Sequence, residues 1–185
     1  MRFLGSLLIS RRRPFALFAM VCIGLLTFGY YLQAYAGQEP CPLCVFQRVA
    51  YITIVAIALG ATLHGPRLVG ASVYCSLIAI TALIGAAIAG RQTWLQHLPE
   101  DLVPECGPGL DFMMDAFPLG ETVRKVFQGS GECAKVDWTL LGLSIAEWSL
   151  LWFLAIAASS VALMFVRASQ RSTRVRYRKP RNNLK

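Results

Sequence analysis

The sequence predicts an all-α membrane protein, a bundle of four transmembrane helices with two extracytoplasmic loops and a short amphipathic helix in the second loop. Hydrophobic residues make up 56% of the 185 residues, and the mean hydropathy of +0.53 is too high for a soluble domain of this size. The hydrophobic residues also gather in four runs that lack Asp, Glu, Lys and Arg. We therefore expect residues 1–185 to form a single integral membrane domain.

The four runs are long enough to cross a bilayer as helices. A hydrocarbon core about 30 Å thick takes roughly 20 helical residues, and the runs cover residues 15–36, 49–64, 68–90 and 148–166. The second run is the shortest. The runs lack the two-residue alternation of a membrane β-barrel strand, and lipid offers no hydrogen-bond partner to free backbone groups, so helices are favoured.

The charged residues indicate which loops face the cytoplasm. Of the 18 basic residues, 13 precede the first run, lie between the second and third runs, or belong to the tail 167–185. All ten acidic residues lie in the other two loops, about 37–48 and 91–147. Positively charged loops stay in the cytoplasm, so both termini are expected inside and both of these loops outside. Contact of the tail with anionic lipid then explains the net charge of +8, and nothing else in the chain favours nucleic-acid binding.

The amino end allows a second interpretation. Three arginines at 11–13 precede an apolar run that ends in Ala34-Tyr35-Ala36, as in a cleavable secretory signal. The run is longer than the apolar core of such signals, about 7 to 15 residues, and cleavage would put the two termini on opposite sides. A retained first span is therefore favoured.

The first outward loop contains the segment Cys41-Pro42-Leu43-Cys44. Pro42 disfavours helix in the residue before it, so Cys41 is expected on extended or turned backbone. A helix can resume after Pro42, which places Cys44 near a helix start and Arg48 one turn later on the same face. Arg48 can then stabilise a Cys44 thiolate or donate to a carbonyl oxygen at the lipid boundary. The alternative is an arginine that extends to the lipid headgroups.

The second outward loop is the only long polar segment of the sequence. Apolar residues in it repeat at helical spacing and predict the amphipathic helix: Leu119, Val123, Val126 and Phe127. This helix either lies flat in the membrane interface or packs on the rest of the loop. Gly129-Ser130-Gly131 then supplies flexible backbone just before Cys133.

Four of the six cysteines lie in the outward loops, where disulfides form and persist in an oxidising compartment: Cys41, Cys44, Cys106 and Cys133. A Cys-x-x-Cys unit closes a small ring and favours a thiolate, so Cys41 and Cys44 form the natural redox pair. Cys106 and Cys133 then remain as the second pair. Cys22 and Cys75 lie within the first and third spans, where thiols act as small apolar groups, and no redox role is expected for them.

Two other uses of the loop cysteines stay open. Disulfides in outward loops commonly brace those loops, and Cys106 with Cys133 fits such a brace as well as it fits a redox pair. A zinc site with four thiolates is less favoured, because only one of the two pairs has the spacing of metal ligands. We expect no metal.

Several motifs meet the pattern of a known family. They are Cys41-Pro42-Leu43-Cys44 with Gln47-Arg48, the later Cys106, Gly129-Ser130-Gly131-Glu132-Cys133, Trp138 and Leu141-Gly142-Leu143. Together they resemble the disulfide bond formation protein B (DsbB) family. The resemblance covers essentially the whole chain, including the order of the spans and the two unequal outward loops.

The resemblance implies a quinone-dependent protein thiol:disulfide oxidoreductase of the bacterial inner membrane. Such an enzyme reoxidises the soluble periplasmic thiol oxidase DsbA and delivers the electrons to ubiquinone or menaquinone. By the same resemblance, Cys41 and Cys44 are the pair beside the quinone. Cys106 and Cys133 are the pair that meets DsbA, and Arg48 belongs to the quinone site.

Two further positions bear on the resemblance. His97 matches a histidine placed near the quinone in the family, although without the family it would be interpreted as an ordinary interfacial residue. Ala146 departs from the pattern, because relatives carry proline just before the fourth span. This difference leaves the start of the last helix open.

Two other functions compete with this interpretation. The vitamin K epoxide reductase family also combines four or five spans with a Cys-x-x-Cys, but usually places that motif late in the chain. A structural membrane protein would use both disulfides only as braces. Thiols alone cannot be a terminal oxidant, so a redox function requires an external acceptor, and a quinone resides in the lipid where Cys44 and Arg48 are expected.

Overall fold

The computed structural model describes residues 12–36, 40–99, 118, 120–121, 131–134, 136 and 138–178, with the backbone alone at 36, 68, 131–132 and 170–178. Four long helices dominate this part of the chain: α2 (Arg13–Ala36), α3 (Pro42–His64), α4 (Leu68–Gln96) and α8 (Ile145–Arg178). Short α7 (Gly131–Ala134) and a hairpin of β1 (Thr139–Leu140) and β2 (Leu143–Ser144) precede α8. All four long helices are long and apolar enough to cross a membrane. The predicted four-span bundle is confirmed.

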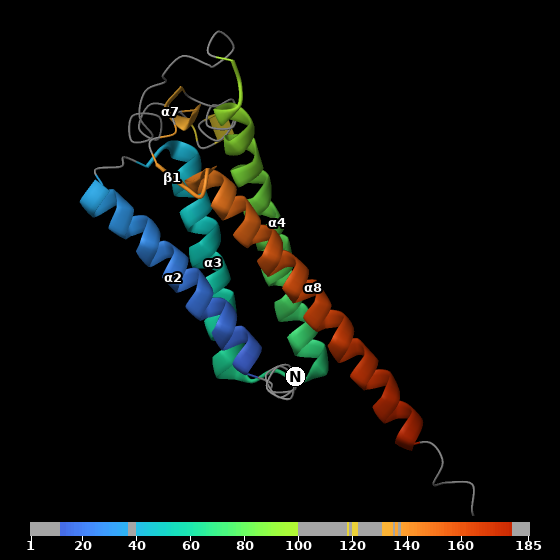
Figure 1. Ribbon diagram of the computed structural model, residues 1–185. Coiled ribbons are helices and arrows are strands. Elements are labelled where there is room, and N and C mark those ends of the chain that lie inside the picture. The colour runs from blue at the N-terminus through green and yellow to red at the C-terminus, as the bar shows by residue number, and fades with distance from the viewer. Residues whose placement is uncertain are drawn as a thin grey trace, which may run out of the picture.

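The helices pack side by side, and the short elements gather at one end of the bundle. α2 lies along α3, α3 along α4, and α4 along α8. Figure 1 shows α7 and β1 at the end of the bundle where α3 begins and α4 ends. The predicted amphipathic helix at 119–127 lies outside the described residues apart from Gly120 and Glu121, which are helical, and Cys106 also lies outside them.

Helix α3 begins where Pro42 of the first loop predicts. Pro42 occupies the first turn, and Cys41 before it is extended, with φ −65° and ψ 162°. The helix therefore starts before the predicted span 49–64 and includes Arg48. The charged Arg48 side chain interrupts the apolar run, but it does not interrupt the backbone hydrogen bonds of the helix. Gly65 ends the helix in the left-handed conformation, with φ 58°.

Helix α8 begins with a reciprocal capping pair. The Glu147 carboxylate accepts a hydrogen bond from the Ser144 backbone N–H at 2.7 Å, and the Ser144 hydroxyl accepts one from the Glu147 N–H at 3.3 Å. The hairpin turn before it places Leu141 and Gly142 at positive φ, 57° and 81°, the geometry of a tight two-residue turn. Capping therefore fixes the start of α8 even though alanine, not proline, stands at position 146.

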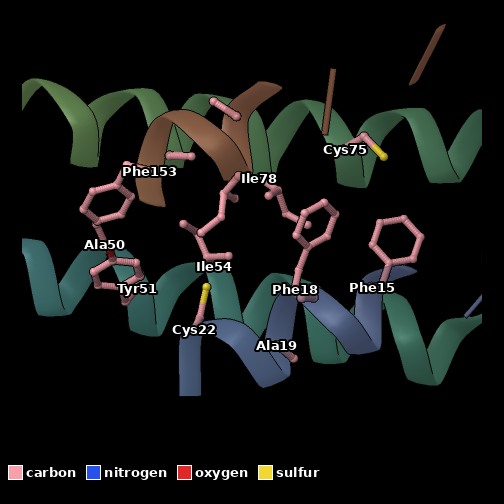
Figure 2. Close-up of a cluster of buried hydrophobic side chains, with 14 of the residues drawn as sticks. Phe15, Phe18, Ala19, Cys22, Ala50, Tyr51, Ile54, Cys75, Ile78 and Phe153 are labelled. Carbon is pink, nitrogen blue, oxygen red and sulfur yellow. The ribbon is translucent and has the colours of Figure 1, made fainter. Parts of the chain in front are cut away.

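One buried cluster draws side chains from all four long helices. Figure 2 shows these side chains between the helices, among them Phe18 of α2, Ile54 of α3, Ile78 of α4 and Phe153 of α8. Cys22 and Cys75 are buried in the same cluster and lie apart from each other (Figure 2). Their placement matches the expectation that they serve as small apolar residues.

Close contact between α4 and α8 depends on a glycine. A Cβ atom added at Gly85 would lie 2.4 Å from a ring carbon of the buried Phe153 side chain, so the ring or the two helices would have to shift. We expect Gly85→Ala to destabilise the protein by about 1–3 kcal/mol, as overpacked cores do. Thermal unfolding in detergent measures this loss, and Gly24→Ala is the control, because nothing lies within 4 Å of a Cβ there. Equal midpoints for the two variants would contradict this packing.

Candidate redox site

Three sulfur atoms from two loops meet at the start of α3. The Cys41 and Cys44 thiols, which are not bonded to each other here, lie with their Sγ atoms 3.0 Å apart. Cys133 on α7 lies within hydrogen-bonding reach of Cys41. Cys41 and Cys133 are buried in one small cluster with side chains of α3 and α4 such as Leu43 and Leu95. The fold thus brings a second-loop cysteine to the first-loop pair.

The surroundings of Cys41 disfavour a negative charge on its sulfur. Hydrogen bonding with Cys133 and with Cys44, together with burial, raises the pKa of the Cys41 thiol far above its ordinary value. Cys44 instead lies in the first turn of α3, where the partial positive charge of the helix end favours an anion. The pair is therefore asymmetric, and Cys44 is the sulfur better suited to leave as a thiolate.

Two buried glutamines complete the surroundings of the sulfurs. Gln47 on α3 and Gln92 on α4 are each only 5% exposed. The Gln47 amide donates to Oε1 of Gln92 at 2.7 Å, and Nε2 of Gln92 donates to the Sγ atoms of Cys44 at 3.2 Å and Cys41 at 3.5 Å. The sequence motif includes Gln47, but sequence analysis misses Gln92, because a single glutamine near the end of an apolar run belongs to no motif.

A cavity of about 320 Å³ opens beside Cys44. Its walls are mostly aliphatic and aromatic side chains of α2, α8 and the segment before α8, including Leu26, Trp138 and Trp152. Cys44 and Arg48 both line it, so the predicted one-turn spacing does bring them to the same space.

Arg48 is held at the cavity by two contacts from α2. Its Nη1 donates to Oε1 of Gln33 at 2.7 Å, and its guanidinium carbon lies 4.6 Å from the centre of the Tyr30 ring. A guanidinium carries five N–H donors in a fixed fork, so donors beyond the one engaged by Gln33 can serve a bound molecule. Sequence analysis misses Gln33 and Tyr30, because it gives no distance between the first span and Arg48.

His97 is not among the residues that line this cavity. The histidine follows the end of α4, and its side chain is 66% exposed. Its Nδ1 donates to the Thr93 carbonyl at 2.8 Å, and its Nε2 lies 3.7 Å from Oε1 of Glu147. In this structure His97 therefore links the end of α4 to the start of α8.

The motifs and the fold agree with a match to a family model. The model described as disulfide bond formation protein DsbB matches residues 11–163, a range that includes both cysteine-bearing loops. The chain belongs to the DsbB family. The resemblance inferred from the motifs is thereby confirmed, and the chain is a multi-pass membrane oxidoreductase that forms disulfide bonds.

Curated DsbB proteins resemble the chain over most of its length. A disulfide bond formation protein B of Azoarcus sp. (strain BH72) is 51% identical over 158 residues, which are 84% of this chain and 94% of that protein. The protein of the same name from Aromatoleum aromaticum is 46% identical over 86% of this chain and 95% of its own length. Disulfide bond formation protein B 1 of Pseudomonas aeruginosa is 44% identical over 87% of this chain and 99% of its own length.

Proposed function

We propose that this DsbB-family protein reoxidises a periplasmic dithiol oxidase of the DsbA type and passes the electrons to a membrane quinone, ubiquinone or menaquinone. A DsbA–DsbB–quinone system is already known to keep bacterial periplasms oxidising. One observation carries the proposal for this chain. Within the Cys41–Cys44 pair, Cys41 contacts Cys133 of the second loop, and Cys44 faces the cavity that Arg48 also lines.

The residues around the cavity fit a quinone ring. A quinone is a flat, largely apolar ring with two carbonyl oxygens, and the cavity offers aliphatic and aromatic walls with a guanidinium among them. Arg48 would donate to a carbonyl oxygen, and Trp138 and Trp152 would contact the ring or its chain. Bound quinone supplies the acceptor for the two electrons and two protons that the Cys41–Cys44 dithiol gives up when its disulfide forms again.

The thiol exchanges that precede this step run from the second loop to the first. A thiolate of the partner attacks Cys106, the Cys106–Cys133 bond breaks, and Cys133 leaves as a thiolate. Cys133 then attacks Cys41, so that the Cys41–Cys44 bond breaks and Cys44 leaves as a thiolate toward the cavity. The second thiol of the partner resolves the mixed disulfide and releases Cys106. Cys106 finally attacks Cys133, which restores the second pair and frees Cys41.

The charge distribution supports a location in the bacterial inner membrane with the redox loops in the periplasm. The basic residues concentrate before the first span, between the second and third, and after the fourth. The two cysteine-bearing loops lie on the opposite side and hold the acidic residues. A soluble periplasmic partner could then reach the second loop, while the quinone arrives through the lipid.

Turnover with purified protein tests the proposed function. With reduced DsbA-type partner in excess over the chain, and quinone in excess over the partner, we expect the partner to be oxidised completely. One quinol should form for each partner molecule that is oxidised. Without quinone, oxidation should stop once the disulfides of the chain itself are consumed. Thiol titration of the partner and the absorbance of the quinone measure both amounts. A Cys22→Ala, Cys75→Ala double variant should turn over normally, and oxidation to the same limited extent with and without quinone would refute the proposal.

A further inference from the structure

The buried Gln47–Gln92 pair has a fixed orientation relative to the reacting sulfurs. Gln47 donates to Oε1 of Gln92, so the N–H₂ end of the Gln92 amide is the end that faces the sulfurs. That end lies 3.2 Å from Sγ of Cys44 and 3.5 Å from Sγ of Cys41. Both amides are buried, where a donor without a partner is costly and a hydrogen bond to an anion is strong.

We propose that Gln92 is a further catalytic residue, whose amide N–H stabilises the thiolate that forms on Cys44, and that Gln47 is a positioning residue that holds this amide in place. The inference deepens the proposed function and rests on it. It assigns to α4 a role in the chemistry of a cysteine pair that belongs to the start of α3.

The role follows from where the charge goes during exchange. When Cys133 attacks Cys41, the electron pair of the Cys41–Cys44 bond moves to Cys44, and no proton is needed from the amide. A donor that is already 3.2 Å away stabilises this charge without rearrangement. Lowering the energy of the departing thiolate speeds the exchange, because a better leaving thiol is displaced faster.

The same amide can also serve the protonated thiol. The Cys44 thiol can donate to Oε1 of Gln92 at 3.6 Å, a longer contact than the one through Nε2. Because Gln47 already donates to that oxygen, the arrangement favours the donor role of Gln92 and hence the anionic sulfur. Other groups near Cys44 also carry charge or titrate, namely Cys41, Cys133 of α7, and Arg48 and Tyr51 of α3. The test must therefore separate the amide from these groups.

Replacing Gln92 with methionine provides that test, because methionine has a similar shape and no N–H donor. In the reduced full-length protein, the rate of Cys44 alkylation by iodoacetamide is measured against pH, with the labelled peptide identified by mass spectrometry. We expect Gln92→Met to shift the midpoint of this profile upward and to lower the alkylation rate near neutral pH by roughly tenfold, the effect of one hydrogen bond to a charged group. Gln47→Met should shift it in the same direction by less.

Controls separate the proposed role from general damage to the fold. Gln96 lies one turn later on α4 and accepts from the Ser144 hydroxyl at 2.7 Å, away from the sulfurs. Gln96→Met should therefore keep the wild-type profile. If Gln92→Met does not fold, Gln47→Met must still show the shift. Wild-type profiles in both Gln92→Met and Gln47→Met would overturn the inference, and so would a shift in Gln96→Met equal to theirs. Alkylation needs neither partner nor quinone, so this result is independent of whether the proposed turnover occurs.

Discussion

Cys133→Ser should reduce the oxidation of a DsbA-type partner to the uncatalysed rate, although it leaves Cys41 and Cys44 intact. Cys133 is the described second-loop cysteine, and its thiol reaches the buried Cys41. Without it, the proposed relay lacks the thiolate that attacks Cys41. The rate of partner oxidation with quinone in excess measures this loss.

A small dithiol distinguishes a broken relay from a damaged fold. Dithiothreitol can reduce the Cys41–Cys44 disulfide directly, so Cys133→Ser should still reduce quinone when dithiothreitol replaces the protein partner. Cys44→Ser should fail with both reductants, because it removes the redox pair itself. Oxidation of the protein partner by Cys133→Ser at the wild-type rate would mean that the second-loop disulfide is only a brace.

Arg48→Met should raise the KM for quinone at least roughly tenfold, the cost of a lost hydrogen bond from a charged donor. Arg48 lines the cavity beside Cys44 and keeps donors beyond its contact with Gln33. Exchange between the protein partner and the cysteines should change little, because the hydrogen bond and the ring contact of Arg48 are made with Gln33 and Tyr30 of α2.

Separate assays of the two half-reactions check the role of Arg48. Quinone reduction is followed with the Cys41–Cys44 pair already reduced, and thiol exchange is followed without quinone. Arg91→Met is the matched control, because the Arg91 guanidinium lies 4.3 Å from the centre of the Trp94 ring and does not line the cavity. An equal loss in both half-reactions would count against a role at the quinone. Unchanged quinone kinetics would favour an arginine that only extends to the headgroups.

Local sequence patterns predict much of the fold and part of the site. Apolar runs identify the four helices, because a segment that crosses lipid must be apolar and must form its backbone hydrogen bonds within itself, as a helix does. The proline at 42 predicts the start of α3, and helical spacing then places Cys44 and Arg48 on one face. These features depend on residues a few positions apart, so a single sequence is enough to find them.

The features that the sequence does not reveal depend on contacts between distant segments. Gln92 lies far along the chain from Cys44, and only the packing of α4 on α3 brings its amide to the sulfur. The contact of Cys133 with Cys41 likewise requires α7 to pack on α3 and α4. The start of α8 is set by the hydrogen bonds between Ser144 and Glu147, and sequence analysis leaves it open because position 146 has alanine in place of proline.

Disulfide mapping in a trapped complex tests the order of the relay most directly. A reduced DsbA-type partner that keeps only its attacking cysteine is mixed with the oxidised chain, quenched with acid and digested for mass spectrometry. We predict a mixed disulfide between the partner and Cys106, a second bond between Cys41 and Cys133, and Cys44 as a free thiol. A complex in which Cys41 remains bonded to Cys44, or in which Cys133 is bonded to Cys44, would contradict the relay through Cys41.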